Sequence, residues 1–400
     1  MTIETRETLA VEGGAPVRSS FLPYHQPLID ADDEGAVVET LRSGWLTTGP
    51  RTKGFEKDLA AYAGAAYCVG VNSCTAALHL ALEAVGVGSG DEVITSPITF
   101  ASTANVIVHR GARPVFVDVE PDTFNINPGG IEAALTPRTK ALIPVDFAGQ
   151  PCDLDAIMGI GVRHGLPVIE DAAHALGAEY RGRRLGTLAD LTTFSFHPVK
   201  HVTTGEGGLV TTASDEMNAR LRRFRNHGLE TEFKVRHEKG DEYTPMVDLG
   251  YNYRLTDVAC ALGLSQLAKL DHFLKRRAEL AQRYRTELAR QPGVLLPDVS
   301  PDVRHVWHIF PILLEIERLA ADRRTILAAL RAENIGVTVH YVPVYWHPYY
   351  RARGYERGLC PNAEWAFEHL LTLPLFPAMS DEDVDDVLAA VRKVLGHYLR

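Results

Sequence analysis

Short apolar runs alternate with stretches of helical periodicity over the first half of the chain. Tyr67–Val71 and Glu92–Thr95 have the pattern of buried strands. The same pattern continues with expected strands at Pro114–Val119, Ala141–Asp146, Pro167–Glu170, Leu191–Ser195 and Gly208–Thr212, and expected helices at Thr75–Val85, Ala101–His109, Asp153–Arg163 and Glu216–His227. Because strands that alternate with helices are typical of βαβ units, we expect an α/β fold with a mainly parallel sheet.

The pattern changes after residue 228. Residues 228–250 are polar and lack periodicity, which predicts a loop, whereas residues 257–290 predict one long helix with an apolar face that links two lobes. A smaller α+β lobe is then predicted from strands at His305–Leu314 and Val337–Tyr341 and helices at Arg323–Asn334 and Asp381–Leu395. The expected organisation is a loose N-terminal arm at residues 1–20, a large domain at 21–256, and the linking helix with a small C-terminal domain at 257–400.

Composition excludes several classes of protein. The formal net charge of −10 argues against non-specific nucleic-acid binding, which needs a basic face. The five cysteines are widely spaced and form no CxxC pair, so neither a disulfide framework nor a zinc site is expected. The N-terminus has no apolar core, and no apolar stretch approaches the ~20 residues that span a bilayer, so we expect a cytoplasmic protein without membrane contact.

Three segments place polar side chains where a ligand would lie. Asp171 ends an apolar strand, and Lys200 follows a strand that ends at Ser195, after a turn containing Pro198. In open α/β sheets, ligands bind beyond the carboxyl ends of the strands. The third segment, Ser73–Thr75, leads from a strand into a helix, where free N–H groups favour phosphate.

Together these segments suit pyridoxal phosphate (PLP). The phosphate would lie at the helix that starts near Thr75, with the Ser195 hydroxyl as a further donor. Asp171 would hold a proton on the pyridine nitrogen, so that the ring acts as an electron sink. Lys200 would form a Schiff base and, when released, move a proton between carbon atoms, for which partial burial must lower its pKa.

Each residue also has a structural interpretation without catalysis. An isolated lysine is usually solvated, Asp171 is a plausible helix cap, and His174 is equally plausible as a core histidine. Plain helix capping by Ser73 or Thr75 and core packing by Phe100 are alternatives as well. His197 and His201 have ligand-like spacing, but Pro198 interrupts a helix there and no third ligand follows, so no metal is expected.

An aromatic run between residues 341 and 350 allows three interpretations. It comprises Tyr341, Tyr345, Trp346, His347, Tyr349 and Tyr350. Such side chains pack in a small-lobe core, form a subunit seam, or stack on a nucleotide-sugar at the rim of a site. We expect a mixture of these roles.

The motifs, taken in order, resemble the DegT/DnrJ/EryC1/StrS family of sugar aminotransferases. The likeness extends from about Phe21 to near the C-terminus. It rests on seven segments: Gly44–Pro50, Asn72–Leu78, Asp91–Thr95, Glu170–His174, Ser195–Lys200, Gly205–Gly208 and Gly250–Asp257. The resemblance implies an aspartate aminotransferase-like fold, PLP fold type I, with a mainly parallel sheet of the seven-stranded type in the large, PLP-binding domain and a smaller C-terminal α+β domain.

The resemblance also implies roles for individual residues. Lys200 matches the Schiff-base lysine, Asp171 the partner of the pyridine nitrogen, and His174 a residue near the phenolic oxygen. The other implied cofactor contacts are Ser73, Cys74, Thr75 and Ser195 around the phosphate and Phe100 stacked on the ring. Relatives with histidine in place of the lysine are dehydratases, so Lys200 favours transamination.

Asn252 matches a residue that reaches the cofactor phosphate of a neighbouring subunit. The resemblance therefore implies a homodimer with shared active sites.

The expected reaction moves an amino group from L-glutamate, which leaves as 2-oxoglutarate, to C4 of a UDP-linked 4-keto-6-deoxy-hexose. Segments Ser96–Phe100, Val145–Pro151 and Ser195–His197 resemble transaminases of the pseudaminic acid route, and the aminoarabinose enzymes are similar. Gly205 stands where those enzymes often have alanine. Alternatives are a dTDP- or GDP-sugar aminated at C3 or C4, a keto-inositol, or, in another class, a non-catalytic PLP-binding regulator, against which the intact Lys200, Asp171 and Ser195 set argues.

Overall fold

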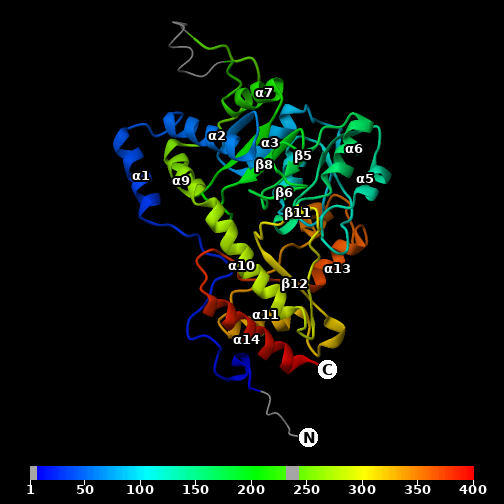
Figure 1. Cartoon of the computed structure of the whole chain (residues 1–400). Helices are drawn as coiled ribbons and strands as arrows, with labels where there is room; N and C mark the ends of the chain where they lie inside the picture. The colour runs from blue at the N-terminus through cyan, green and yellow to red at the C-terminus, as the bar shows by residue number, and fades with distance from the viewer. Residues whose placement is uncertain (1–6, 231–242) are drawn as a thin grey trace.

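The computed structural model describes residues 7–230 and 243–400 (Figure 1). The first six residues of the predicted arm and residues 231–242 of the predicted loop lie outside the described residues. Within this described part, no helix is both long and apolar enough to cross a membrane.

Seven strands of the described chain form the central sheet of the upper lobe (Figure 1). They are β1 (Tyr67–Val71), β2 (Glu92–Thr95), β3 (Arg113–Phe116), β4 (Thr139–Ile143), β5 (Ile169–Asp171), β8 (Leu191–Ser195) and β9 (Gly208–Thr212). Their order is β1-β9-β8-β5 and then β4-β2-β3, joined by parallel bridges between Leu142 and Val168 and between Val145 and Asp171. Pairing is parallel except on both sides of β9, so the expectation of a mainly parallel α/β sheet is confirmed.

Helices cover both faces of this sheet. They are α1 (Ala31–Ser43), α2 (Pro50–Ala63), α3 (Cys74–Ala84), α4 (Ser102–His109), α5 (Pro128–Ala134), α6 (Leu154–His164), α7 (Asp215–Arg225) and α9 (Asp257–Ala268). Adjacent strand residues point to opposite faces. Cys68 packs with α2 and α6, whereas its neighbour Val69 packs with α3, α4 and α7, so the lobe has three layers.

The predicted single helix over residues 257–290 is two helices. α9 ends at Ala268, and α10 (Leu270–Leu288) begins after Lys269. The Lys269 N–H donates to the carbonyl of Gln266, three residues earlier. The α-helical pattern, in which each N–H bonds to the carbonyl four residues earlier, is therefore interrupted at Lys269. α10 then runs from the upper lobe to the lower one (Figure 1).

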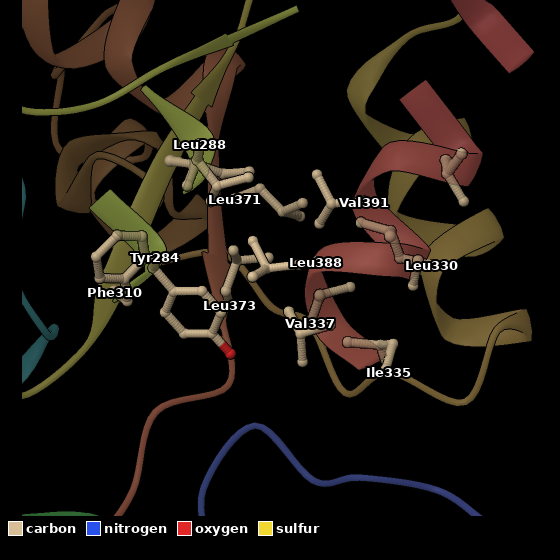
Figure 2. Packing of buried hydrophobic residues seen from close by; sticks show 14 of the residues in the cluster. Tyr284, Leu288, Phe310, Leu330, Ile335, Val337, Leu371, Leu373, Leu388 and Val391 are labelled. Carbon is tan, nitrogen blue, oxygen red and sulfur yellow. The ribbon is translucent and has the colours of Figure 1, made fainter. Parts of the chain in front are cut away.

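The lower lobe packs helices against a short antiparallel sheet. Its elements are β10 (Val294–Leu295), β12 (Phe310–Leu314), β13 (Leu370–Leu373), α11 (Arg323–Ala332), α12 (Pro348–Arg351), α13 (Pro361–His369) and α14 (Asp381–Tyr398). β6 (Glu179–Tyr180), β7 (Arg183–Arg184) and β11 (Val303–Arg304) form a third small sheet. Figure 2 shows apolar side chains of α10, α14 and β13 meeting between the elements of this lobe.

Two predicted strands of this lobe are shorter or absent. The strand expected over 305–314 begins only at Phe310, because Trp307 has a positive φ of 50°. Residues 305–309 turn towards the upper lobe instead, where the N–H groups of Val306 and His308 donate to carbonyls of residues 148–149. Val337–Tyr341 makes one isolated bridge, from Thr338 to Thr372, rather than a strand. Other expected elements are present, with ends that differ by a few residues.

The predicted loose arm is wrong for residues 7–20. Leu9 is fully buried in the lower-lobe core. The backbone N–H groups of Ala10 and Val17 donate to the Glu333 carboxylate at 2.9 Å each, and Lys393 pairs with the same buried group. Burial of this carboxylate is tolerated because its oxygens have partners, so the segment is fixed to the lower lobe.

A matched pair of valines tests the lower-lobe core. Val391 of α14 is 1% exposed and Val162 of α6 is 80% exposed. We expect Val391→Ala to lower the free energy of unfolding by about 2 kcal/mol or more, because two methyl groups lose burial and leave a cavity. Val162→Ala should change it by less than about 0.5 kcal/mol. Urea denaturation measures both, and equal shifts would contradict the assignment of this core.

Candidate functional site

Asp171 lies at the carboxyl end of β5, opposite Thr193 of the parallel strand β8. The side chain is buried and accepts hydrogen bonds from Thr103 Oγ1 at 2.8 Å and from the N–H of Ala173 at 3.2 Å. Burial raises the pKa of this carboxyl, and the two hydrogen bonds and the nearby Lys200 charge oppose that shift. A positive charge brought beside Asp171 would therefore favour its ionised form.

Two more buried carboxyls lie behind Asp171. Asp146 and Glu170 are fully buried, and Glu170 accepts a hydrogen bond from Thr192 Oγ1 at 2.7 Å. Burial raises the pKa of both groups, and the Glu170 charge raises that of Asp146 further. Protonation therefore reduces the negative charge behind Asp171.

Lys200 lies in the turn that follows β8. Its backbone N–H donates to the carbonyl of His197 at 2.9 Å, and its Nζ lies 3.2 Å from His308 Nε2. Part of the Lys200 side chain faces a cavity that Asp171 also lines, and protein surrounds the rest of the side chain. Desolvation therefore lowers the pKa of the amine to about 8, although the electrostatic effects of Cys74 and Asp171 raise it. The side chain is not a solvated surface lysine.

His174 follows Asp171 closely and lies beneath the same cavity. Its Nε2 is 3.1 Å from the hydroxyl of Tyr341, which comes from the lower lobe. Burial lowers the pKa of His174 well below the usual value, so the ring is neutral. Phe100 is 63% exposed, and its ring makes a steeply tilted contact with the ring of Tyr341, so it is not core packing.

The first turn of α3 forms another wall. Ser73 is the N-cap, and its Oγ accepts the N–H of Ala76 at 3.1 Å, so the plain capping interpretation is correct for this residue. Gly208 of β9 passes so close that a Cβ there would lie 2.6 Å from Cys74 N. The strand thus lies directly against the helix start, where backbone donors favour an anion.

These residues line one cavity of about 630 Å³, within the ~300–1,000 Å³ common for sites of cofactors and small molecules. Of the predicted site residues, the cavity brings together Ser73, Cys74, Thr75, Phe100, Asp171, His174, Ser195 and Lys200. Asn252 is exposed and does not line this cavity. Its carbonyl lies 3.5 Å from the side-chain amide of Asn72, a cavity residue.

Three contacts were not predicted from the sequence. Thr103 binds Asp171, His308 binds Lys200, and Tyr341 binds His174. Each partner is distant in sequence, and a lone threonine or histidine carries no motif. Tyr341 is part of the aromatic run, but the run does not indicate that it contacts His174. The run of apolar and aromatic residues around His308 indicated a strand, which concealed its place in the site.

The aromatic run at 341–350 has mixed roles, as expected. Tyr345 and Tyr350 are buried in a core with Phe116, whereas Tyr341 lines the large cavity. Trp346 is partly buried against the same core. His347 and Tyr349, with Tyr350, line a separate surface pocket of about 340 Å³ beside α4. His197 and His201 form no metal-binding group with other residues in the described ranges.

The donor set fits PLP. The α3 start and the Ser195 hydroxyl suit the phosphate, and the Asp171 carboxylate suits a protonated ring nitrogen. His174 Nδ1 is buried without a hydrogen-bond partner among the described residues, so it has capacity for a ligand atom. The Lys200 amine, with its lowered pKa, suits an aldehyde.

Comparisons with known proteins agree with this chemistry. The chain is 48% identical over 381 residues to the spore coat polysaccharide biosynthesis protein SpsC of Bacillus subtilis, covering 94% of this chain and 98% of SpsC. Helicobacter pylori PseC, an aminotransferase involved in the biosynthesis of pseudoaminic acid, superposes with a TM-score of 0.88 at 31% identity, covering 95% of this chain and all of PseC.

A sugar aminotransferase-like protein of Streptococcus pneumoniae, Spr1654, is also similar. It has been solved in PLP and PMP forms; the PLP form gives a TM-score of 0.88 at 34% identity, covering 95% of this chain and 100% of that protein. The family model of DegT/DnrJ/EryC1/StrS aminotransferases matches residues 27–392. The chain therefore belongs to the DegT/DnrJ/EryC1/StrS family and is a PLP-dependent aminotransferase.

Proposed function

We propose that this aminotransferase moves the amino group of L-glutamate to C4 of a UDP-linked 4-keto-6-deoxy-hexose. The observation that carries the proposal is the common cavity of Lys200, Asp171 and the α3 N-terminus. This cavity combines an amine that can form a Schiff base with PLP, a carboxylate that can pair with the protonated ring nitrogen, and a helix N-terminus that can bind the phosphate. Bound PLP supplies the electron sink that stabilises negative charge at the reacting carbon.

The protein's own groups supply the rest of the chemistry. Asp171 holds a proton at the ring nitrogen, and Thr103 Oγ1 orients the carboxylate by donating to Oδ2. Lys200 Nζ, partly neutral near pH 8, would accept the proton from the amine-bearing carbon of glutamate and deliver it to the cofactor carbon that takes up the amine. Glutamate leaves as 2-oxoglutarate, and the keto-sugar then receives the amine.

The sugar substrate is supported by two kinds of observation. PseC acts in pseudoaminic acid biosynthesis and SpsC in spore coat polysaccharide biosynthesis. Beyond the cofactor residues, the cavity wall carries groups that suit hydroxyls and a sugar ring, namely Tyr24, His197, Glu206 and His340.

We further propose a homodimer in which Asn252 acts in the site of the partner subunit. Asn252 is exposed and outside its own cavity, although its backbone approaches Asn72 at the cavity wall. A second chain related by twofold symmetry would bring such a residue to the other site. The cytoplasm is the proposed location.

Replacement of the lysine tests the cofactor linkage. We expect Lys200→Ala to lose the near-visible band of bound PLP and to lower turnover by about a hundredfold or more, because the covalent amine and the proton shuttle are both removed. Lys140→Ala, at an exposed lysine of β4, is the control and should keep both properties. Full turnover in Lys200→Ala would refute the assignment.

A panel of acceptors tests the substrate. UDP-, dTDP- and GDP-4-keto-6-deoxy-hexoses and a keto-inositol are compared by 2-oxoglutarate formation from L-glutamate. We expect the UDP-sugar to exceed the others in kcat/KM by about tenfold or more. A preference for the keto-inositol or another nucleotide would replace the proposed acceptor and leave the cofactor chemistry unchanged.

Complementation tests the shared site. Chains carrying Lys200→Ala are co-expressed with chains carrying Asn252→Ala, each variant being weakly active by itself. If Asn252 acts across the interface, mixed dimers hold one intact site, and the mixture should regain about a quarter of wild-type activity. No gain over the separate variants would show that Asn252 acts within its own chain or not at all.

A further inference from the structure

The Lys200 amine has a second partner besides the cofactor. Its Nζ lies 3.2 Å from Nε2 of His308, a residue 108 positions later in the chain that also lines the cavity. His308 belongs to the segment between β11 and β12, which turns from the lower lobe towards the large lobe. Neither the cofactor contacts nor the capping of any helix accounts for this histidine.

The His308 ring is fixed in place from several sides. Its backbone N–H donates to the carbonyl of Ala148 at 2.9 Å, and its own carbonyl accepts from Arg277 Nη1 at 3.1 Å. The ring centroid lies 4.2 Å from that of His174 and 5.6 Å from that of His201. With 3% of its surface exposed, the side chain has little freedom to swing away from Lys200.

His308 is a neutral partner. Burial lowers its pKa well below the usual value, and the charge of Lys200 acts in the same direction. A neutral imidazole has one N–H and one lone pair, so it can either donate or accept at Nε2. Nδ1 is buried and has no partner among the described residues, so no second hydrogen bond fixes the tautomer.

This pairing suits an amine that changes its protonation state. An ammonium group donates to the Nε2 lone pair, whereas a neutral amine accepts from an Nε2–H in the other tautomer. A carboxylate at the same place would stabilise only the ammonium form and would raise the pKa of Lys200. The charged and titratable groups around this pair are Cys74, Asp171, His174, His201, His340, His25 and Arg277.

We propose that His308 is a positioning residue that holds the Lys200 amine, in both of its protonation states, whenever that amine is not bonded to the cofactor. The inference rests on the proposed role of Lys200 as the cofactor-linked proton shuttle. During proton transfer Nζ would gain one proton from one carbon and give one to the other, where one carbon belongs to the substrate and the other to the cofactor, so the amine is left with no net change in charge. His308 keeps the amine within reach throughout by exchanging donor and acceptor roles.

Two substitutions at His308 separate hydrogen bonding from packing. His308→Leu removes both donor and acceptor, whereas His308→Gln keeps one of each on an amide. His201→Gln is the control, because His201 is equally buried in the same cluster but bonds to the Val306 carbonyl instead of Lys200. If His308→Leu does not fold, His308→Met replaces it as a flexible apolar side chain.

The first measurement is the rate at which the cofactor-free full-length protein binds PLP. The visible absorbance band of the bound cofactor reports this rate, which is measured at several pH values between about 6 and 10. Capture needs the neutral amine, so the wild-type rate should rise with a midpoint near the Lys200 pKa of about 8. His308→Leu should move the midpoint down by about one pH unit, because an ammonium loses more from a missing hydrogen bond than a neutral amine does. His308→Gln and His201→Gln should stay near wild type.

The second measurement is turnover with glutamate and a keto-sugar. We expect His308→Leu to lower kcat by about tenfold to a hundredfold with KM changed by less than about twofold, and His308→Gln to recover most of the rate. An unchanged midpoint and kcat in His308→Leu, or equal losses in the leucine and glutamine variants, would overturn the inference. Absence of the visible band in wild type would instead overturn the proposed role of Lys200, on which the inference depends.

Discussion

The site depends on the parallel pairing of β5 with β8. Because Asp171 is opposite Thr193, the carboxyl ends of both strands open at one edge of the sheet. The turn after β8 then returns Lys200 to the cavity that Asp171 also lines. A register shift of one residue would point the Asp171 side chain to the other face of the sheet and separate the two groups.

Hydrogen bonds, rather than close ion pairs, keep the charged groups of this site in order. Asp171 is held by Thr103 and a backbone N–H, and Lys200 by a neutral imidazole. Arg277, fully buried in α10, donates to the carbonyls of Trp307, His308 and Leu375. Its charge also disfavours protonation of the nearby histidines, so the cluster around Lys200 stays neutral.

Much of the fold could be predicted because its signals are local. Strand and helix periodicity predicted the α/β sheet. Asp171 at the end of one strand and Lys200 in the turn after another indicated the site. Contacts such as Thr103 with Asp171 and His308 with Lys200 could not be predicted, because they join residues far apart that belong to no motif.

Two wrong predictions, the single long helix over residues 257–290 and the loose N-terminal arm, concern features that local periodicity does not record. The break at Lys269 changes one backbone hydrogen bond without altering the apolar periodicity of the helices on either side. The N-terminal arm is polar by composition, yet two of its backbone N–H groups have partners more than three hundred residues away, and Leu9 lies in a core formed mainly by residues 280–395. Local periodicity contains no information on such partners.

The attachment of the N-terminal segment to Glu333 has a consequence for synthesis of the protein. Leu9 and Leu22 complete a core whose other members come from residues 280–395. During translation the upper lobe can therefore form its sheet first, while residues 9–22 remain without their core partners until residues 280–395 have left the ribosome. Chaperone binding or proteolysis of the nascent chain should concentrate on that waiting segment.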